Sequence, residues 1–513
     1  MAEFRLPDLK TAGFILATTL VAYNVLRVLY NFLFHPLAKY PGPLLWRISR
    51  LPYAISLATG NLVHDTWAIH NKYGKVVRLA PDELSFIDRE ALHDIYGARG
   101  KGHSEFTKNP AWVRPAPNGV FSILDSFEDD HTRQRKILNH AFSPGALKAQ
   151  EPFLQKYTGL LIAEARKRGS IDLKDWYNFT TFDITGDLTF GQSFECLEKG
   201  RYHRWVSFLF AHLKASCLLA SITFYPFFDK ILWYCIPKSA FNERIYHFGR
   251  SVEWVHKRLS QKTDRNDFMS YVSQNNEKGE FTMKEIEATA GTLVIAGSET
   301  TSTVLLSTTR NLMIHKEKME KLKKEIRGAF KDESEITLKA VENLPYLAAV
   351  FQENFRYTPP VPCSIPRTVP DGGDTIAGDM YPGGTFVGFP QIAAYRSHHH
   401  FAHPNEFIPE RWLPSDHPLY KPTNTDPEFS KDTFKDDNFK IVTPFSVGPR
   451  MCIAQILAYA EMKLILGRML WNFDFKIPQG KEQEYVKPWV EQKTYGLWVK
   501  EPYVMEMVDV VRE

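Results

Sequence analysis

Residues 445–454 of this chain read FSVGPRMCIA, and they say more about the fold than any other stretch. A glycine-proline turn presents one cysteine, Cys452, where an amphipathic segment begins. The sequence predicts that this thiol lies at the positive end of a helix dipole, with Arg450 two residues away, and both features favour the thiolate. A thiolate can ligate a metal, and haem iron is one of its standard partners. The alternative is a free cysteine that serves as a small buried hydrophobic residue.

The order of residues in this loop favours the ligand. Phe445, Gly448, Arg450 and Cys452 resemble the haem-ligand loop of the cytochrome P-450 family, whose pattern is Phe-x-x-Gly-x-Arg-x-Cys-x-Gly. The chain departs from the pattern only at Ala454, where the family has glycine, and alanine is small enough to keep a helix close to a porphyrin. The resemblance implies heme b (iron protoporphyrin IX) as the cofactor and Cys452 as the axial ligand of its iron.

A second motif lies upstream, where residues 296–301 read AGSETT inside a helical pattern that covers residues 282–314. Glycine in a helix costs about 1 kcal/mol relative to alanine, and Thr300 can bond back to the carbonyl one turn earlier, as can Thr301. One interpretation of Gly297 is a packing glycine. The other is a groove for dioxygen beside the haem, in which Glu299 and Thr300 relay protons. The stretch resembles the acid-alcohol motif of the same family.

A charge triad is expected between the two motifs. Glu353 and Arg356 are three residues apart, so on a helix they share a face and can pair. Their neighbours are apolar, which predicts burial, and the alternative is an exposed pair of little energetic value. In the family such a pair is joined by an arginine from a segment like residues 407–412, FIPERW, and here that arginine is Arg411. The implied role is to fix the core around the cysteine loop.

The two haem propionates need cationic partners, and arginine is the usual one. The resemblance carries Arg450 over from the cysteine loop and Arg367 from the segment after the Glu-x-x-Arg pair. Arg135 fits a Trp-x-x-x-Arg segment of the family, although His131 stands where the family has tryptophan. Each of these residues has an alternative interpretation as an ordinary polar side chain. By family position, the substrate should meet residues 106–121, 208–233, 293–300, 361–365 and 494–498.

The N-terminus predicts a membrane anchor. Residues 12–34 are nearly all apolar, long enough to span a bilayer with some tilt, and no small-residue cleavage site follows them. Basic residues on the C-terminal side place the body in the cytosol by the positive-inside rule. We therefore expect a single-pass protein of the endoplasmic reticulum membrane. Three prolines in residues 35–43 indicate a stiff hinge.

A second apolar region covers residues 208–236. Lysine, aspartate and proline interrupt it, so it makes a poor second membrane helix. It either packs in the core or forms a lid that dips into the membrane surface. The sequon at Asn178 matters only if this part of the chain is lumenal.

The rest of the body shows helical periodicity with a few strand signals. We predict helices at residues 131–142, 155–168, 282–314, 317–330 and 452–473. We predict strands at residues 76–79, 84–87 and 375–389, and a polar surface excursion at residues 416–440. The fold class is thus mainly α with small β-sheets, a cytochrome P-450 fold behind an N-terminal transmembrane helix. The predicted parts are the anchor (residues 1–34), the proline-rich hinge (35–50) and the haem-binding catalytic domain (51–513).

Composition sets further limits. The chain has 513 residues and a net charge of +4, without a basic stretch typical of nucleic-acid binding. Five cysteines in spacings that fit neither a disulfide framework nor a zinc site indicate a reducing compartment. The helix at residues 316–327 is rich in lysine, which indicates either a solvated face or a docking surface for an acidic redox partner.

The resemblance implies a haem-thiolate monooxygenase similar to those of filamentous-fungal secondary metabolism. It would take electrons from NADPH through a partner reductase and oxidise an apolar small molecule, with a terpenoid or polyketide intermediate as the expected class. Two alternatives stay open: a haem-thiolate isomerase or dehydratase, and a membrane-tethered haem-binding protein without catalysis.

Overall fold

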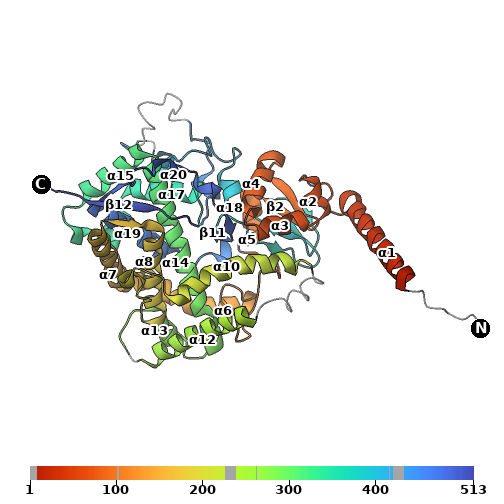
Figure 1. Cartoon of the computed structure of the whole chain (residues 1–513), viewed down its shortest axis with the longest axis horizontal. Coiled ribbons are helices and arrows are strands. Elements are labelled where there is room, and N and C mark those ends of the chain that lie inside the picture. The colour runs from red at the N-terminus through yellow and green to blue at the C-terminus, as the bar shows by residue number, and fades with distance from the viewer. Residues whose placement is uncertain are drawn as a thin grey trace, which may run out of the picture.

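The computed structural model describes residues 9–100, 103–225, 238–261, 263–414, 416–419 and 433–512. Helices make up most of the body, and the first helix projects from one side of it (Figure 1). The expected class, mainly α with small sheets, is confirmed. The described α-helices are α1 (Leu9–Leu29), α2 (Leu44–Ile48), α3 (Leu51–Ala58), α4 (Leu62–Tyr73), α5 (Arg89–Tyr96), α6 (Glu128–Leu138), α7 (Pro144–Arg168), α8 (Leu173–Phe190), α9 (Cys196–Lys199), α10 (Arg204–Thr223), α12 (Lys238–Ser260), α13 (Phe268–Asn275), α14 (Met283–Ile314), α15 (Lys316–Ala329), α16 (Leu338–Glu342), α17 (Pro345–Tyr357), α18 (Gln391–Tyr395), α19 (Gln455–Asn472) and α20 (Glu482–Tyr485). Short 3-10 turns occur at Asn139–Phe142, Glu333–Glu335, Pro409–Trp412, Phe439–Ile441, Gly448–Arg450 and Trp489–Glu491.

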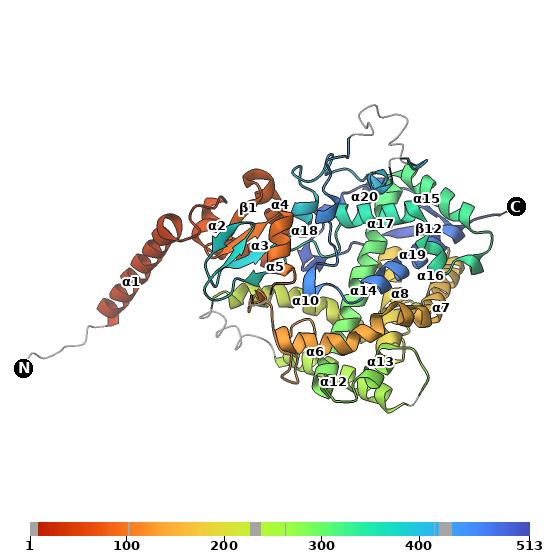
Figure 2. The same cartoon turned by 180° about the vertical axis from the view of Figure 1, so that it is seen from behind.

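The strands form small sheets around the helical core. A five-stranded sheet in the order β1-β2-β8-β5-β3 lies next to α1, and a three-stranded sheet in the order β4-β12-β9 lies on the far side of the body (Figures 1 and 2). In the larger sheet β2 and β8 are parallel and the other pairs antiparallel. Two further pairs are β6–β7 and β10–β11. The bounds are β1 (Val76–Ala80), β2 (Glu83–Phe86), β3 (Thr107–Lys108), β4 (Ser170–Asp172), β5 (Arg367–Thr368), β6 (Asp374–Ile376), β7 (Asp379–Tyr381), β8 (Phe386–Gly388), β9 (Phe473–Lys476), β10 (Thr494–Tyr495), β11 (Leu497–Trp498) and β12 (Val504–Asp509).

Helix α14 runs through the centre of the body. It starts at a capping box, in which the Thr282 side chain accepts from the N–H of Glu285 while the Glu285 carboxylate accepts from the N–H of Thr282. Most of its residues are buried, and its most extensive packing contact is with α8. The predicted span of residues 282–314 agrees with the helix found.

Other predicted helix bounds were less accurate. The helix expected from residue 155 starts at Pro144, and the one expected from Cys452 starts only at Gln455. Helix α8 was not predicted. Nearly all of its residues are buried, so it shows no alternation between an apolar and a polar face.

The lysine-rich helix α15 is not a free basic surface. Lys321 pairs with Glu410, and Lys323 and Arg327 both pair with Asp474. Because these three of the six basic side chains of this helix pair with acids outside it, less positive charge is left for the docking-surface interpretation.

The junction between α1 and the body is packed. After α1 a π-helical turn covers Tyr30–Phe34. Leu37 and Tyr40 of the proline-rich segment are buried in the core. The fully buried Arg78 donates from its backbone N–H to the carbonyl of Pro41 at 2.7 Å and from Nη1 to the carbonyl of Asn31 at 2.9 Å. The segment predicted as a hinge is therefore held against the body by packing as well as stiffened by proline.

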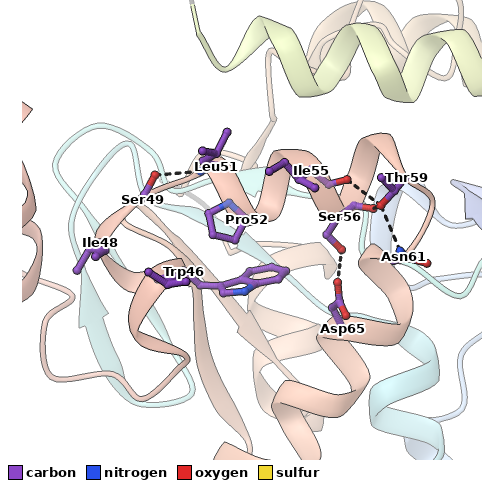
Figure 3. A pocket seen from close by; sticks show the side chains of 11 residues that line it. Trp46, Ile48, Ser49, Leu51, Pro52, Ile55, Ser56, Thr59, Asn61 and Asp65 are labelled. Atoms are coloured by element: carbon purple, nitrogen blue, oxygen red, sulfur yellow. Dashed lines mark hydrogen bonds between the residues drawn. The ribbon is translucent and has the colours of Figure 1, made fainter.

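An apolar surface continues from α1 onto α2 and α3. Its exposed side chains are large: Leu44, Leu45, Leu51 and Ile55 are each more than half exposed. A groove of about 540 Å³ opens here, between α2, α3 and the start of α4 (Figure 3). Residues proposed for the site do not line it, so this groove is separate from the cysteine loop.

Two helices within the described residues are long and apolar enough to cross a membrane by length and composition, Lys10–Phe34 and Arg204–Thr223. The first has a mean hydropathy of 1.6 and no buried residue in its apolar window, whereas 29% of the window of the second is buried. Residues 226–237, the second half of the predicted lid, lie outside the described residues, as do residues 420–432 of the predicted surface excursion.

Glu461 of α19 is a buried carboxyl group that the sequence did not mark. It is 2% exposed, and its Oε1 has no hydrogen-bond partner among the described residues. Burial raises the pKa of Glu461 from 4.5 to about 8. Between these pH values the folded chain binds more protons than the unfolded chain, so the free energy of unfolding falls as the pH rises from about 5 to 8.

Replacement of Glu461 by glutamine should remove this pH dependence. We expect Glu461→Gln to match the wild type within about 1 kcal/mol at pH 5 and to be more stable by about 2–4 kcal/mol at pH 8, measured by urea unfolding. Glu277→Gln, at an exposed position, is the control and should change stability equally at both pH values. A gain for Glu461→Gln that is the same at pH 5 and pH 8 contradicts the titration.

Candidate active site

The cysteine loop is built on a close approach between two backbones. Gly448 has a φ of +74°, and a Cβ there would lie 2.3 Å from the carbonyl oxygen of Tyr96 at the end of α5. The N–H of Cys452 donates to the carbonyl of Phe445 at 2.8 Å and closes the loop. The Phe445 ring packs against Phe355 at 5.5 Å between ring centroids. The glycine and the phenylalanine of the motif thus fix the loop that carries the thiol.

Cys452 is accessible to solvent, although protein atoms lie close around its thiol. This close packing is enough for burial to raise the pKa of the thiol above its ordinary value. The expectation that Arg450 favours the thiolate is wrong for this arrangement, and burial outweighs the effect of the backbone N–H at the start of the helix. Arg450 pairs with Glu105 instead. The N–H of Ala454, just before α19 begins at Gln455, and then Arg135 lower the pKa of the thiol against the larger effect of burial.

Arg450 and Arg367 converge on one carboxylate. Arg450 holds Glu105 with two bonds, Nε to Oε1 at 2.8 Å and Nη2 to Oε2 at 3.0 Å, and it also donates to the carbonyl of Ser126. Arg367 reaches the same Glu105 Oε1 at 3.4 Å, while its buried Nε has no partner among the described residues. A planar guanidinium with an unused donor is suited to a further carboxylate.

Three more nitrogen-bearing side chains belong to this cluster. Lys108 of β3 lies directly opposite Arg367 of β5 in the strand register, and its burial and the nearby Arg450 and Arg367 lower the pKa of Lys108 to about 7. Arg135 donates from Nη1 to the carbonyl of Met451, next to the thiol. His131 is buried, and its burial together with the surrounding cations lowers the pKa of its imidazole to about 3, so it is neutral at physiological pH.

This donor set fits haem. Four side chains carry a positive charge each when protonated: Lys108, Arg135, Arg367 and Arg450. The carboxylates that raise the pKa values of these cations are Glu105 and Asp125, and they supply two negative charges. The site therefore has two positive charges in excess when Lys108, whose pKa is about 7, is protonated. Like charges opposite each other on paired strands are destabilising, so an anion placed here is favoured. Two propionates would bring two negative charges. The accessible thiol of Cys452, which follows the residue bonded by Arg135, is the candidate iron ligand.

One strip of α14 stays accessible although the helix is otherwise mostly buried. Ala296 is exposed, and Thr292, Leu293 and Thr300 are half-buried. These positions are three or four residues apart and share a face. The Thr300 hydroxyl donates to the carbonyl of Ala296 at 2.7 Å, which confirms the predicted bond to the preceding turn.

Gly297 lies at the contact of α14 with α8. A Cβ at this position would lie 2.8 Å from Cγ2 of Thr185. Next to it, Ser298 donates from its hydroxyl to the carbonyl of Thr181 at 3.1 Å. The geometry favours the packing interpretation of this glycine.

Glu299 faces away from the accessible strip. The residue is 4% exposed, and its carboxylate pairs with Lys500 at 2.8 Å between Nζ and Oε1. Burial raises the pKa of Glu299, and Lys500 acts in the opposite direction. Thr300 and Glu299 are therefore neighbours in sequence whose polar atoms bond to different partners.

The structure brings Glu353, Arg356 and Arg411 together in the core. Arg356 donates to both oxygens of Glu353 at 2.7 and 2.8 Å, and Arg411 Nε lies 3.5 Å from Glu353 Oε1. All three side chains are fully buried. Glu353 also accepts from the N–H of Ile408 and from Trp412 Nε1. Burial alone would raise the pKa of Glu353, but the two arginines hold it below its usual value.

Sequence reasoning missed Glu105, Lys108 and Lys500. Glu105 and Lys108 fall at the edge of a segment assigned to substrate contact, and a single acid and a single lysine carry no pattern there. Lys500 stands alone before the last strand. Only the fold places these residues against Arg450, Arg367 and Glu299.

The chain matches the family model "Cytochrome P450" over residues 40–502. It is 40% identical over 509 residues to cytochrome P450 monooxygenase atr2 of Stereocaulon alpinum, covering 98% of this chain and 96% of that one. It is 37% identical to cytochrome P450 monooxygenase astJ of Aspergillus oryzae, covering 95% of each chain. It is 39% identical to averantin hydroxylase of Dothistroma septosporum, covering 96% of this chain and 91% of that one.

Proposed function

The chain belongs to the cytochrome P450 family, and from that premise we propose that it uses haem held by Cys452 to insert oxygen into an apolar small molecule. Its relatives are fungal monooxygenases of secondary metabolism, so it is an oxidoreductase that tailors such metabolites. We propose a polyketide or terpenoid intermediate as the substrate. The observation that carries the proposal is the accessible Cys452 beside a cluster with two excess positive charges.

Each part of the cluster has a proposed task. Cys452 would ligate the iron, and when haem is bound this thiolate ligation supplies the chemistry of dioxygen cleavage. Arg450, Arg367, Arg135 and Lys108 would neutralise the propionates. His131 stays neutral and can donate one N–H. Phe445 and Gly448 hold the loop in shape.

Glu299 and Thr300 are proposed to supply protons during dioxygen reduction. Thr300 lies on the accessible strip of α14, where its hydroxyl can exchange the bond to Ala296 for a bond to a ligand. Glu299 is one residue away and is the acid nearest to it in sequence. A positioned acid or alcohol typically contributes a factor of 10² to 10⁴ to such a step.

Removal of the Thr300 hydroxyl should uncouple electron use from product formation. For Thr300→Val we expect product formed per NADPH to fall by roughly 10²-fold, with hydrogen peroxide released instead. Thr300→Ser keeps a hydroxyl and should stay within about threefold of the wild type. Equal product yields for the valine and serine variants contradict a role for the hydroxyl in proton supply.

Electrons would come from NADPH through a partner reductase. We propose that α1 anchors the protein in the endoplasmic reticulum membrane with the body in the cytosol, where such a reductase can reach it. The exposed apolar side chains of α2 and α3 continue the apolar surface of α1 and support a body that rests on the bilayer. Helix α10 packs on α3, so the start of the predicted lid lies on this side.

Asn178 is buried and its side chain is hydrogen-bonded, which argues against glycosylation there.

The test is expression of the full chain with a fungal NADPH-dependent reductase, followed by a screen of metabolite extracts for products that gain one oxygen atom. Consumption of NADPH and dioxygen with such a product supports the proposal. Conversion of a substrate without use of either favours the isomerase or dehydratase instead, and haem binding without any turnover favours the non-catalytic alternative.

A further inference from the structure

Lys500 is buried at the centre of a polar network that ties three parts of the chain together. Its ammonium group makes three contacts: Glu299 Oε1 at 2.8 Å, Ser302 Oγ at 2.9 Å and Asn178 Oδ1 at 2.9 Å. The lysine side chain is 4% exposed and that of Glu299 is 5% exposed. An ammonium has three N–H donors, so this one is fully used, and its position is defined by α14 and α8 together.

The network continues from Asn178 to the surface. Asn178 Nδ2 donates to the Tyr202 hydroxyl at 2.9 Å, and this hydroxyl donates to Asp175 Oδ1 at 2.9 Å. The Asp175 side chain is 31% exposed and also pairs with Lys174. Because Tyr202 takes the NH₂ group of Asn178, the amide oxygen must face Lys500. The orientation of each group is thus set by the next one outward.

The second oxygen of Glu299 is left open. Oε1 accepts from Lys500, whereas Oε2 is buried and has no hydrogen-bond partner in the part of the chain that the structure describes. A buried oxygen without a partner is unfavourable, and in a carboxyl group assigned to proton supply it is the atom free to exchange a proton.

We propose that Lys500 is a positioning residue for Glu299: it binds Oε1, fixes the carboxyl group against α8, and leaves Oε2 as the oxygen that exchanges protons during turnover. The proposal rests on the proposed function, since it assigns a supporting residue to the same proton supply. It adds Asn178 and Ser302 as the groups that hold the ammonium in place.

The charges around Glu299 give the expected direction of change. Lys500 and Lys174 lower the pKa of Glu299 against the larger effect of burial, and Asp175 and the Tyr202 hydroxyl are the other titratable groups of the network. Loss of Lys500 removes a charge that lowers the pKa of Glu299, while burial still raises it. Glu299 should therefore hold its proton to higher pH. Loss of Lys174, which does not contact Glu299, should act in the same direction but weakly.

The first experiment measures the protonation of Glu299 without turnover. Infrared difference spectra of the haem-loaded full chain against Glu299→Gln report the protonated carboxyl band over a pH titration. We expect the midpoint to rise by at least one pH unit in Lys500→Met and by less than half a unit in Lys174→Met. An unchanged midpoint in Lys500→Met overturns the proposal.

The second experiment separates positioning from general damage to the fold. With the reductase, NADPH and dioxygen, the ratio of peroxide released to oxygen consumed should rise at least threefold in Lys500→Met. Guaiacol oxidation driven by cumene hydroperoxide, which needs no dioxygen reduction, should stay within twofold of the wild type. Equal losses in both reactions show a merely structural role and overturn the proposal.

Ser302→Ala is the milder variant if Lys500→Met does not fold. It removes one contact of the ammonium from a small buried site, so we expect a smaller rise in the same ratio, about 1.5-fold, and Lys174→Met should leave the ratio unchanged. A ratio for Ser302→Ala equal to that of the wild type counts against the network. If the wild type itself consumes no oxygen with NADPH and the reductase, the proposed function fails, while the infrared titration still decides the role of Lys500.

Discussion

Replacement of Cys452 by serine should abolish the carbon-monoxide difference spectrum of a haem-thiolate protein and reduce turnover below detection. A serine hydroxyl is not a thiolate and cannot take its place as the electron-donating iron ligand. The loop itself should persist, because the backbone bond from Cys452 to Phe445 and the close approach at Gly448 do not involve the sulfur. The measurement is the reduced carbon-monoxide spectrum of the purified chain, normalised to haem content.

Cys196→Ala is the matched control for this substitution. Cys196 is a buried free thiol whose pKa burial raises to about 12, so it is an unreactive hydrophobic side chain. We expect its replacement to leave the spectrum unchanged. An unaltered spectrum in Cys452→Ser, or a lost one in Cys196→Ala with haem still bound, contradicts the assignment of the ligand.

Glu353→Ala should be the most destabilising single change in the core. It leaves Arg356 and Arg411 buried without their shared carboxylate and removes the acceptor of Ile408 N–H and Trp412 Nε1. Breaking a buried ion pair from one side costs about 3–5 kcal/mol. We expect thermal unfolding of the full chain to occur roughly 3–5 °C lower, with a matching loss of haem content.

The control for this change uses a pair with the same spacing on the surface. Arg250 and Glu253 are also three residues apart and pair at 2.6 Å, but their side chains are 45% and 63% exposed. Glu253→Ala should cost less than about 0.5 kcal/mol, since exposed pairs contribute little. Similar losses for both variants would mean that the triad is no more important than a surface ion pair.

The sequence sufficed wherever a local pattern reflects a local requirement. The helix at residues 282–314 was predicted from its periodicity and starts at the capping box of Thr282 and Glu285. The pairing of Glu353 with Arg356 followed from a three-residue spacing on a helix. The cysteine loop was predicted because Phe445, Gly448, Arg450 and Cys452 resemble the family pattern, and the roles of the glycine and the phenylalanine depend on the loop itself.

The residues that sequence reasoning missed depend on contacts between distant segments. Lys108 joins the cationic cluster because β3 pairs with β5, more than two hundred residues later. Lys500 meets Glu299 because the segment before β12 crosses α14. The direction of the Cys452 pKa shift was also out of reach, because Arg450, next to the thiol in sequence, is turned toward Glu105.

The packed junction after α1 sets the boundary for any shortened version of the protein. Arg78 is fully buried and takes the carbonyl groups of Asn31 and Pro41 as partners. A truncation that removes only the apolar helix keeps both, whereas one that begins at the first residue of α2 removes the acceptor of Nη1 and the acceptor of the backbone N–H. Two buried donors of Arg78 then lose their partners, and the guanidinium keeps only its bonds to the carbonyl of Pro81. For crystallisation or solution work the cut therefore belongs before Asn31, and the few residues that look like dispensable linker are part of the folded body.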